Sequence, residues 1–290
     1  MWNLLQIELY KIFKRPRTYI AFAAIAALII IIQFGLKVDG QSYVDFMLGN
    51  LDSFEITGNV LNGYLVCYII LQLMLIHVPL LVTLVAADMI SGEANMGTLR
   101  LVLSKPYSRV QIMLAKFTAV SVYTLLLLIF MAVLALFVSM FLFGTDDFFL
   151  MKSDYTILLR GDDVFWRYCC ALAFAFVSLI TVAALGFFLS VFAENSIGPI
   201  VATMSIIVFF TVLGTLDLPV FRHITPYLFT THMITWKEFF DEKVDANNQA
   251  IIGSIQNLPQ VYNSLLILCI HIALFLGGAV IVLKKKDVLS

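Results

Sequence analysis

Six long stretches without Asp, Glu, Lys or Arg set the strongest limit on how this chain can fold. Each has roughly the 20 residues that a helix needs to cross the hydrocarbon core of a bilayer. Backbone polar groups find no water at that depth and must pair within their own segment, which predicts α-helices. The six predicted spans are Thr18–Leu36, Leu61–Ala87, Phe117–Phe143, Tyr168–Phe192, Ile197–Leu216 and Asn263–Leu283.

The composition supports the same fold class. Of the 290 residues, 61% are hydrophobic and only 13% are charged, whereas soluble domains are nearer half apolar and a quarter charged. We therefore predict an all-α, polytopic membrane protein in which residues 1–290 form a single transmembrane domain. The first span is read as a retained helix and not as a signal peptide, because no convincing cleavage site follows it and five more spans come after it.

Basic residues predict the orientation of the spans. Seven of the 18 basic residues fall in the loops on one side and the other eleven on the opposite side. The eleven are Lys11, Lys14, Arg15, Arg17, Arg100, Lys105, Arg109, Lys116, Lys284, Lys285 and Lys286. We therefore expect both termini in the cytoplasm and the protein in the cytoplasmic (inner) membrane of a bacterium. The first two outer loops are acidic and are expected to be solvated.

Residues 1–17 are predicted to form an amphipathic helix in the cytoplasmic interface. Basic side chains lie opposite an apolar arc, although Leu4 and Ile7 blur the pattern. Pro16 is expected to mark the turn into the first span. The alternative is a plain basic anchor that precedes a span. The arc consists of Trp2, Leu5, Leu9, Ile12 and Phe13.

The connection over residues 88–116 is the most informative part of the chain. Gly97 is expected to break the descending helix, and Pro106 to end a short helix over Thr98–Ser104. Ser108 with Gln111 is typical of a capping box for the rising helix. The apolar side of the short helix is large for a solvated loop, which predicts that it docks on something. That could be a partner or the ends of this protein's own helices.

At this connection the sequence resembles the permease subunits of type-2 ATP-binding-cassette (ABC) exporters. The stretch SGEANMGTLRLVLSKPYSRVQIMLAK matches the order of their loop: an acidic residue, Gly-Thr-Leu-Arg, a Ser-Lys-Pro turn and a rising helix. The amphipathic N-terminus, the six spans and the tail VLKKKDVLS also fit. In that family the loop is the coupling element that rests on the ATPase subunit. The resemblance assigns ATPase coupling to Glu93, Gly97, Thr98, Leu99, Arg100 and Pro106, and the apolar side of the helix adds Leu103.

Residues 217–262 form a long, aromatic outer segment. Aromatic side chains favour the bilayer interface, and the resemblance implies short helices that re-enter the outer leaflet between the last two spans. We expect Phe229, Trp236 and Phe240 to contact lipid headgroups or a second permease as an outer gate. The alternative is a folded external loop.

Several kinds of chemistry have no support in the sequence. The phosphate-binding motif G-x-x-x-x-G-K-[ST] is missing, since no Gly is followed by Lys. The predicted spans hold no charged residue that would suggest ion coupling. The four cysteines all fall in apolar runs, where they are expected to be small hydrophobes and not metal ligands. We predict no catalytic residue, no metal site and no nucleic-acid partner.

These observations favour a permease subunit of an ATP-driven exporter, which is not an enzyme by itself. It would pair with a second copy or a paralogue, and a separate cytoplasmic ATPase subunit would bind the ATP and Mg²⁺. The alternative is an ATP-independent membrane scaffold or assembly factor that uses the same loop as a docking site. An intramembrane enzyme ranks third, because the predicted spans lack charged groups.

Overall fold

The computed structural model describes residues 1–48, 60–152, 156–216, 219–245 and 250–286. Within this part of the chain, six helices are long and apolar enough to cross a membrane, as predicted. The candidate spans are Pro16–Gly40, Gly63–Ala86, Arg109–Phe143, Gly161–Ser190, Ile197–Thr215 and Leu258–Lys285. The chain is therefore a polytopic, all-α membrane protein.

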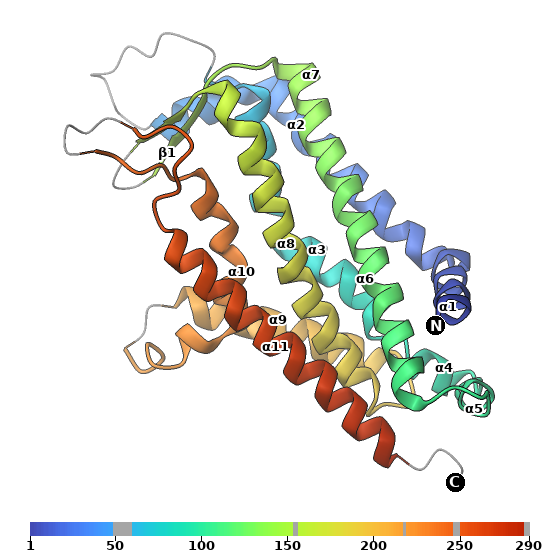
Figure 1. Cartoon of the computed structure of the whole chain (residues 1–290). Helices are drawn as coiled ribbons and strands as arrows, with labels where there is room; N and C mark the ends of the chain where they lie inside the picture. Colours follow the sequence, from blue (N-terminus) through green and yellow to red (C-terminus); the bar gives the residue numbers. More distant parts are fainter. Residues whose placement is uncertain (49–59, 153–155, 217–218, 246–249, 287–290) are drawn as a thin grey trace.

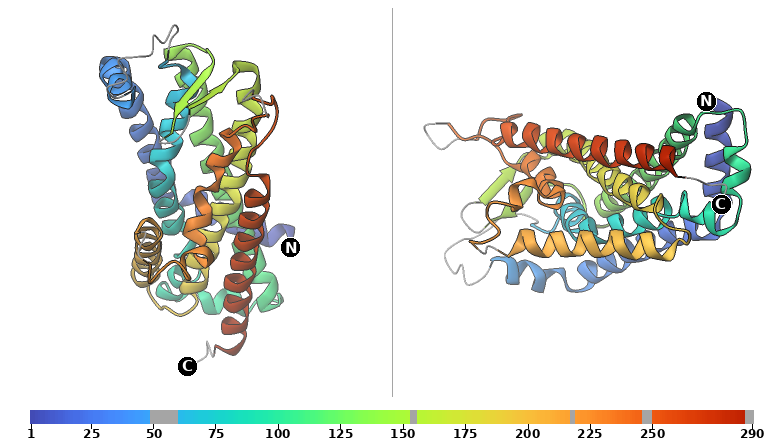
Figure 2. Two further views of the ribbon diagram at one scale, coloured as in Figure 1. Left: turned by 90° about the vertical axis from the view of Figure 1, so that its left-hand side faces the viewer. Right: turned by 90° about the horizontal axis from the view of Figure 1, so that it is seen from below.

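The spans belong to α2 (Pro16–Leu48), α3 (Gly63–Ala86), the rod α6–η1–α7, α8 (Gly161–Ser190), α9 (Ile197–Thr215) and α11 (Leu258–Lys285). The rod consists of α6 (Arg109–Val133), the π-helical η1 (Leu134–Val138) and α7 (Ser139–Phe143). α3 and α8 are the most buried spans and form the centre of the bundle (Figures 1 and 2). α2, α9 and α11 lie at its periphery, and few of their apolar side chains are buried.

Short elements cover the two ends of the bundle. The N-terminal helix α1 (Trp2–Lys14), α4 (Ser91–Asn95), α5 (Leu99–Leu103) and the last turn of α11 lie together at one end, here called the terminal end (Figure 1). The opposite end, here called the hairpin end, carries β1 (Phe148–Met151) and β2 (Thr156–Leu159). The start of the chain and the end of α11 thus lie at the same end of the bundle, as an even number of spans requires.

The antiparallel hairpin β1–β2 corrects the expectation of a solvated second outer loop. Phe148 pairs with Leu159 and Leu150 with Ile157, and all four side chains are buried. Alternate residues of a strand point to the same face, so one face of the hairpin covers the end of the core. The acidic first outer loop falls largely on residues 49–59, outside the described part of the chain.

A π-helical segment explains one polar residue within the membrane. A π-bulge leaves backbone carbonyls without their usual helical partners. The buried side chain of Gln33 donates from Nε2 to Leu134 O at 3.2 Å and to Ser139 Oγ at 3.0 Å. These bonds tie α2 to the α6–η1–α7 rod.

Candidate functional site

The connection over residues 88–116 folds largely as its sequence predicts. Gly97, at φ 68°, ends α4 in the left-handed region that favours glycine. The descending helix α3 already ends at Ala86, so the prediction that Gly97 breaks that helix is wrong. Gly97 N donates to Ala94 O and Thr98 N to Glu93 O, each at 3.0 Å, the pattern of a Schellman cap. Ser108 and Gln111 form the predicted capping box at the start of α6. The predicted helix Thr98–Ser104 is α5, with Thr98 and Ser104 as its flanking residues.

The proposed coupling residues divide into buried and exposed groups. Glu93 and Leu99 are buried, Thr98 is half-buried, and Gly97, Arg100 and Pro106 are exposed. Leu99 belongs to the protein's own core, so the expectation that it faces a partner is corrected. Met96 and Leu101 are exposed apolar residues of the loop, at 56% and 66%. Leu103 ends α5, and its side chain lies outside the described part of the structure.

A buried ion network fixes the loop to the bundle. Lys116 Nζ, on α6, contacts Glu93 Oε1 at 2.7 Å and Glu8 Oε2 at 2.9 Å. Lys11 Nζ, on α1, contacts Glu93 Oε1 and Glu8 Oε1 at 2.8 Å each. Two ammonium groups and two carboxylates neutralise one another, which burial of charge requires. The network joins α1, α4 and α6 into one unit.

The network also shifts the protonation of its members. Burial by itself would raise the pKa of Glu93, but Lys116 and Lys11 outweigh it and hold that pKa below its ordinary value. Burial would likewise lower the pKa of Lys11, yet its bonds to Glu8 and Glu93 raise it. Both groups are therefore held in their charged forms. Among the described residues, Glu93 Oε2 is buried without a hydrogen-bond partner.

A second ion cluster lies beside the first at the start of the loop. The buried Asp88 carboxylate accepts hydrogen bonds from Arg15, Arg17 and Ser196. A side chain at Gly92 would collide with that carboxylate, because a Cβ there would lie 2.5 Å from Asp88 Oδ1. Asp88 thus links the loop to the start of α2 and to the start of α9.

α8 contributes a cap to α4. Ser190 Oγ accepts from Ile90 N at 3.1 Å and from Ser91 N at 2.9 Å. Two N–H groups at the start of α4 are thereby satisfied without a residue of the loop itself. α4 is thus bonded to α1 and α6 through Glu93 and to α8 through Ser91. Asp88, just before α4, adds the links to α2 and α9.

A groove runs between α1 and the α4–α5 loop at the terminal end. Its volume is about 670 Å³. Its lining is partly apolar, and the basic residues Lys11, Arg15 and Lys105 face it together with the carboxylates of Glu8 and Glu93. The lining residues are Leu4, Ile7, Glu8, Lys11, Arg15, Glu93, Met96, Thr98, Leu101, Val102, Lys105, Pro106 and Tyr107.

The structure confirms most of the predicted apolar arc of α1. Ile12 is buried, and Leu5, Leu9 and Phe13 pack against the core, whereas Trp2 is 68% exposed. The most buried stripe, Leu4–Glu8–Ile12, lies beside that arc.

Glu8, Lys11 and Lys116 are site residues that no sequence pattern predicted. The sequence does contain one indication of Glu8. It lies four residues after Leu4 and four before Ile12, so an acidic residue interrupts an apolar stripe on one face of the helix.

The outer segment re-enters the bundle as short helices. These are η2 (Thr225–Tyr227), α10 (Phe229–Met233) and η3 (Ile234–Phe240), and α10 and η3 pack against α8 and α11 (Figure 1). The expected contact of Phe229, Trp236 and Phe240 with headgroups or a second permease is corrected, because all three are buried. Phe229 packs on Phe210 and Phe275, while Trp236 and Phe240 pack on Tyr68.

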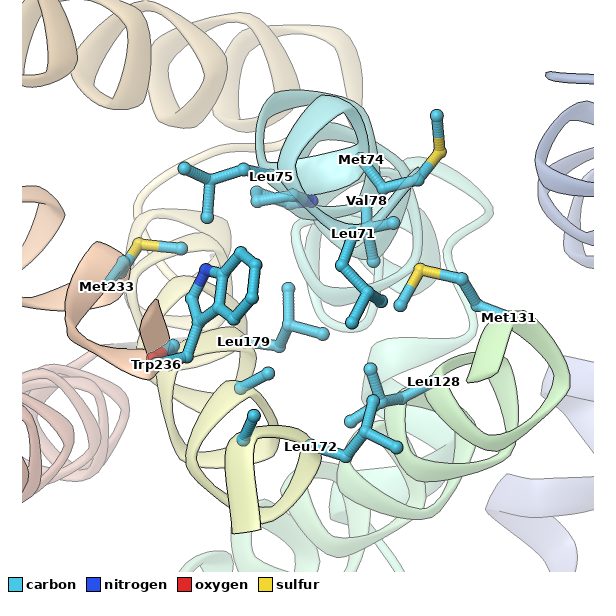
Figure 3. A pocket seen from close by; sticks show the side chains of 14 residues that line it. Leu71, Met74, Leu75, Val78, Leu128, Met131, Leu172, Leu179, Met233 and Trp236 are labelled. Carbon is cyan, nitrogen blue, oxygen red and sulfur yellow. The ribbon is translucent and has the colours of Figure 1, made fainter. Parts of the chain in front are cut away.

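An apolar pocket lies inside the bundle between α3, α6, α8 and this re-entrant segment. Figure 3 shows Trp236 and Met233 on one side, opposite Met131 and Leu128. Its volume of about 50 Å³ is small, since one water molecule in the liquid occupies about 30 Å³. The pocket is therefore no ready-made site for a large ligand.

One comparison with known proteins gave a match. A family model described as a protein of unknown function (DUF2705) matches residues 22–289. The match begins after α1 and includes the whole of residues 88–116. A comparison with curated proteins gave no match.

Proposed function

Because the chain belongs to the DUF2705 family of proteins of unknown function, we propose its activity from the terminal end of the bundle. The chain is the permease subunit of an ATP-driven exporter in the cytoplasmic membrane of a bacterium. A separate cytoplasmic ATPase binds the terminal end, which places both termini in the cytoplasm. ATP and Mg²⁺ bind to that partner. A second copy of the chain, or a paralogue, completes the transport path.

The observation that carries this proposal is the groove between α1 and the α4–α5 loop. Met96 and Leu101 are exposed beside it at an end of the bundle where charged side chains gather. Exposed apolar residues around a concave surface are typical of a protein-binding site. The groove also suits insertion of a helix from a partner.

The contacts of α4 support a role in transmitting motion. A push on α5 reaches α4 through the cap at Gly97, and α4 is bonded to Lys116 of α6 and Ser190 of α8. A rigid unit can pass displacement to the spans, whereas a mobile loop would absorb it. The ion network thus couples the docking surface to the centre of the bundle.

The small internal pocket supports a transport path formed between two copies. The side chains of α2 and α9 leave large apolar surfaces uncovered, including Ile31 and Phe34 on α2 and Phe209 on α9. Lipid or a second permease can cover such surfaces. Because the pocket in Figure 3 is only about 50 Å³, a path within one copy requires rearrangement of the helices.

Affinity purification from the native membrane tests the proposal. The tagged chain is expected to bring down a protein that carries G-x-x-x-x-G-K-[ST], and the complex is expected to hydrolyse ATP. The chain purified alone should show no hydrolysis above background. Reproducible hydrolysis by the isolated chain would contradict the proposal. A stable complex that contains no ATPase would instead favour the ATP-independent scaffold or assembly factor.

A further inference from the structure

A fully buried arginine at the hairpin end binds the re-entrant segment to α8. Arg167, on α8, donates from Nη1 to Phe239 O at 2.8 Å. Its Nη2 reaches Asp163 Oδ2, one turn earlier on α8, at 2.6 Å and Glu242 Oε1, just after η3, at 3.0 Å. One guanidinium therefore holds a carboxylate from each of the two elements.

The charges of this group do not balance when both carboxylates are ionised. One positive charge then faces two negative charges at a site from which water is largely excluded, which is unfavourable. Asp163 Oδ2 and Glu242 Oε1 both contact Arg167 Nη2, so the two carboxyl groups lie close together and repel each other when both are ionised. Burial and the neighbouring Asp163 raise the pKa of Glu242 to about 7, although Arg167 acts against them.

Neighbouring charges leave this imbalance in place. Lys152 Nζ, after β1, lies 2.6 Å from Asp241 Oδ1, so those two charges offset each other. Glu238, on η3, accepts from Asn257 Nδ2 at 2.7 Å. The described part of the chain holds a few more charged side chains near this group, on α8 and on the re-entrant segment. They are the paired Arg160 and Asp162 at the start of α8, Lys237 on η3, and Lys243 and Asp245 after η3.

We propose that Asp163, Arg167 and Glu242 form a proton-dependent latch that docks the re-entrant segment on α8. With a proton on the pair of carboxyls the group is neutral and the segment is held. When the proton leaves, the surplus negative charge weakens the docking of η3. Because Met233 and Trp236 of this segment line the pocket in Figure 3, release of the latch enlarges that pocket.

The direction of the effect follows from linkage. A group whose pKa is higher when docked than when free binds more protons in the docked state. Docking is therefore strongest below the ordinary pKa of a glutamate, 4.5, and weakens as the pH rises toward about 7. This inference does not depend on the proposed ATPase, since the latch lies at the opposite end of the molecule.

Cysteine labelling of the purified full-length chain in detergent tests the latch. All four native cysteines are replaced, and Thr235→Cys places a single thiol on η3, where Thr235 is only 4% exposed. A separate protein with Ile252→Cys, a position that is 59% exposed, corrects for the pH dependence of the maleimide itself. The labelling rate at position 235 is divided by that at position 252 at each pH between 5.5 and 8.5.

The normalised rate is expected to rise by up to about tenfold per pH unit until pH 7 and then to level off. Glu242→Gln and Asp163→Asn each remove the surplus negative charge, so each should hold the rate near its pH 5.5 value throughout. Glu238→Gln is the matched control and should keep the rise. A flat profile in the parent protein would overturn the latch, as would an undiminished rise in both Glu242→Gln and Asp163→Asn.

Discussion

At the scale of single residues, the account depends on the charges buried around α4. Glu93→Gln removes a carboxylate that faces two ammonium groups, one of them on Lys116 with 1% of its side chain exposed. Removing one partner of a buried ion pair costs about 3–5 kcal/mol. We expect the free energy of unfolding in detergent to fall by about that amount. Asp162→Asn is the control: it breaks an exposed pair with Arg160, which is worth about 0–1 kcal/mol. Equal effects of the two substitutions would contradict the buried network.

The same residues predict how stability depends on acid. The pKa of Glu93 is lowered in the folded protein, so its contribution is present above its ordinary value of 4.5 and is lost as the pH falls through the folded value. Lys11, whose pKa is raised, contributes below 10.5 and loses that contribution only at higher pH. Unfolding measured at pH 6 and pH 3 should therefore show a smaller loss of stability in Glu93→Gln than in the parent protein. A loss of the same size would show that Glu93 is not the titrating group.

At the scale of elements, α5 should be the surface that docks the ATPase. Burying one leucine at an interface is worth roughly 1.5–3 kcal/mol, and about 1.4 kcal/mol is a factor of ten in affinity. Leu101→Asp should therefore weaken ATPase binding about tenfold or more while the spans remain inserted. Leu158→Asp places the same charge at a similarly exposed position of the hairpin end and should leave binding unchanged. Unchanged co-purification and ATP hydrolysis in Leu101→Asp would remove α5 from the docking surface.

The elements also differ in how far their sequence predicts them. The spans follow from the absence of charge, and α5 and the capping box follow from local signals such as Gly97 and Ser108. Helix ends are less predictable, because α8 begins at Gly161 and not at Tyr168. Its first two turns carry Asp163 and Arg167, which the fold can bury only because Glu242 and Phe239 O come from elsewhere in the chain.

Some residues have an environment that their local sequence does not predict, because contacts with distant parts of the chain determine it. Leu99, Phe229 and Trp236 are apolar and lie in segments outside the spans, which suggested contact with a partner or lipid. The structure instead buries them against distant helices, and periodicity within a short segment contains no information about such contacts. The loop pattern at residues 88–116 predicted the helix and its caps but not Glu8 or Lys116, which lie outside the motif or at its far end.

At the scale of the whole molecule, the orientation can be tested independently of function. Asn95 at the terminal end and Thr156 at the hairpin end are both exposed. In cells, an impermeant thiol reagent is expected to label a cysteine at position 156 and not one at position 95. The eleven basic residues assigned to the terminal end motivate this expectation. The reverse labelling pattern would invert the protein and place the groove outside the cell.

Site-specific photo-crosslinking is the most direct test of the central claim that an ATPase occupies the terminal end. A photoreactive amino acid replaces Leu101 in the groove, and in a separate protein it replaces Leu158 at the hairpin end. After illumination of native membranes, mass spectrometry identifies each crosslinked protein. The account predicts that position 101 captures a cytoplasmic protein carrying G-x-x-x-x-G-K-[ST], and that position 158 does not. Capture of that protein at both positions, or at neither, would contradict it.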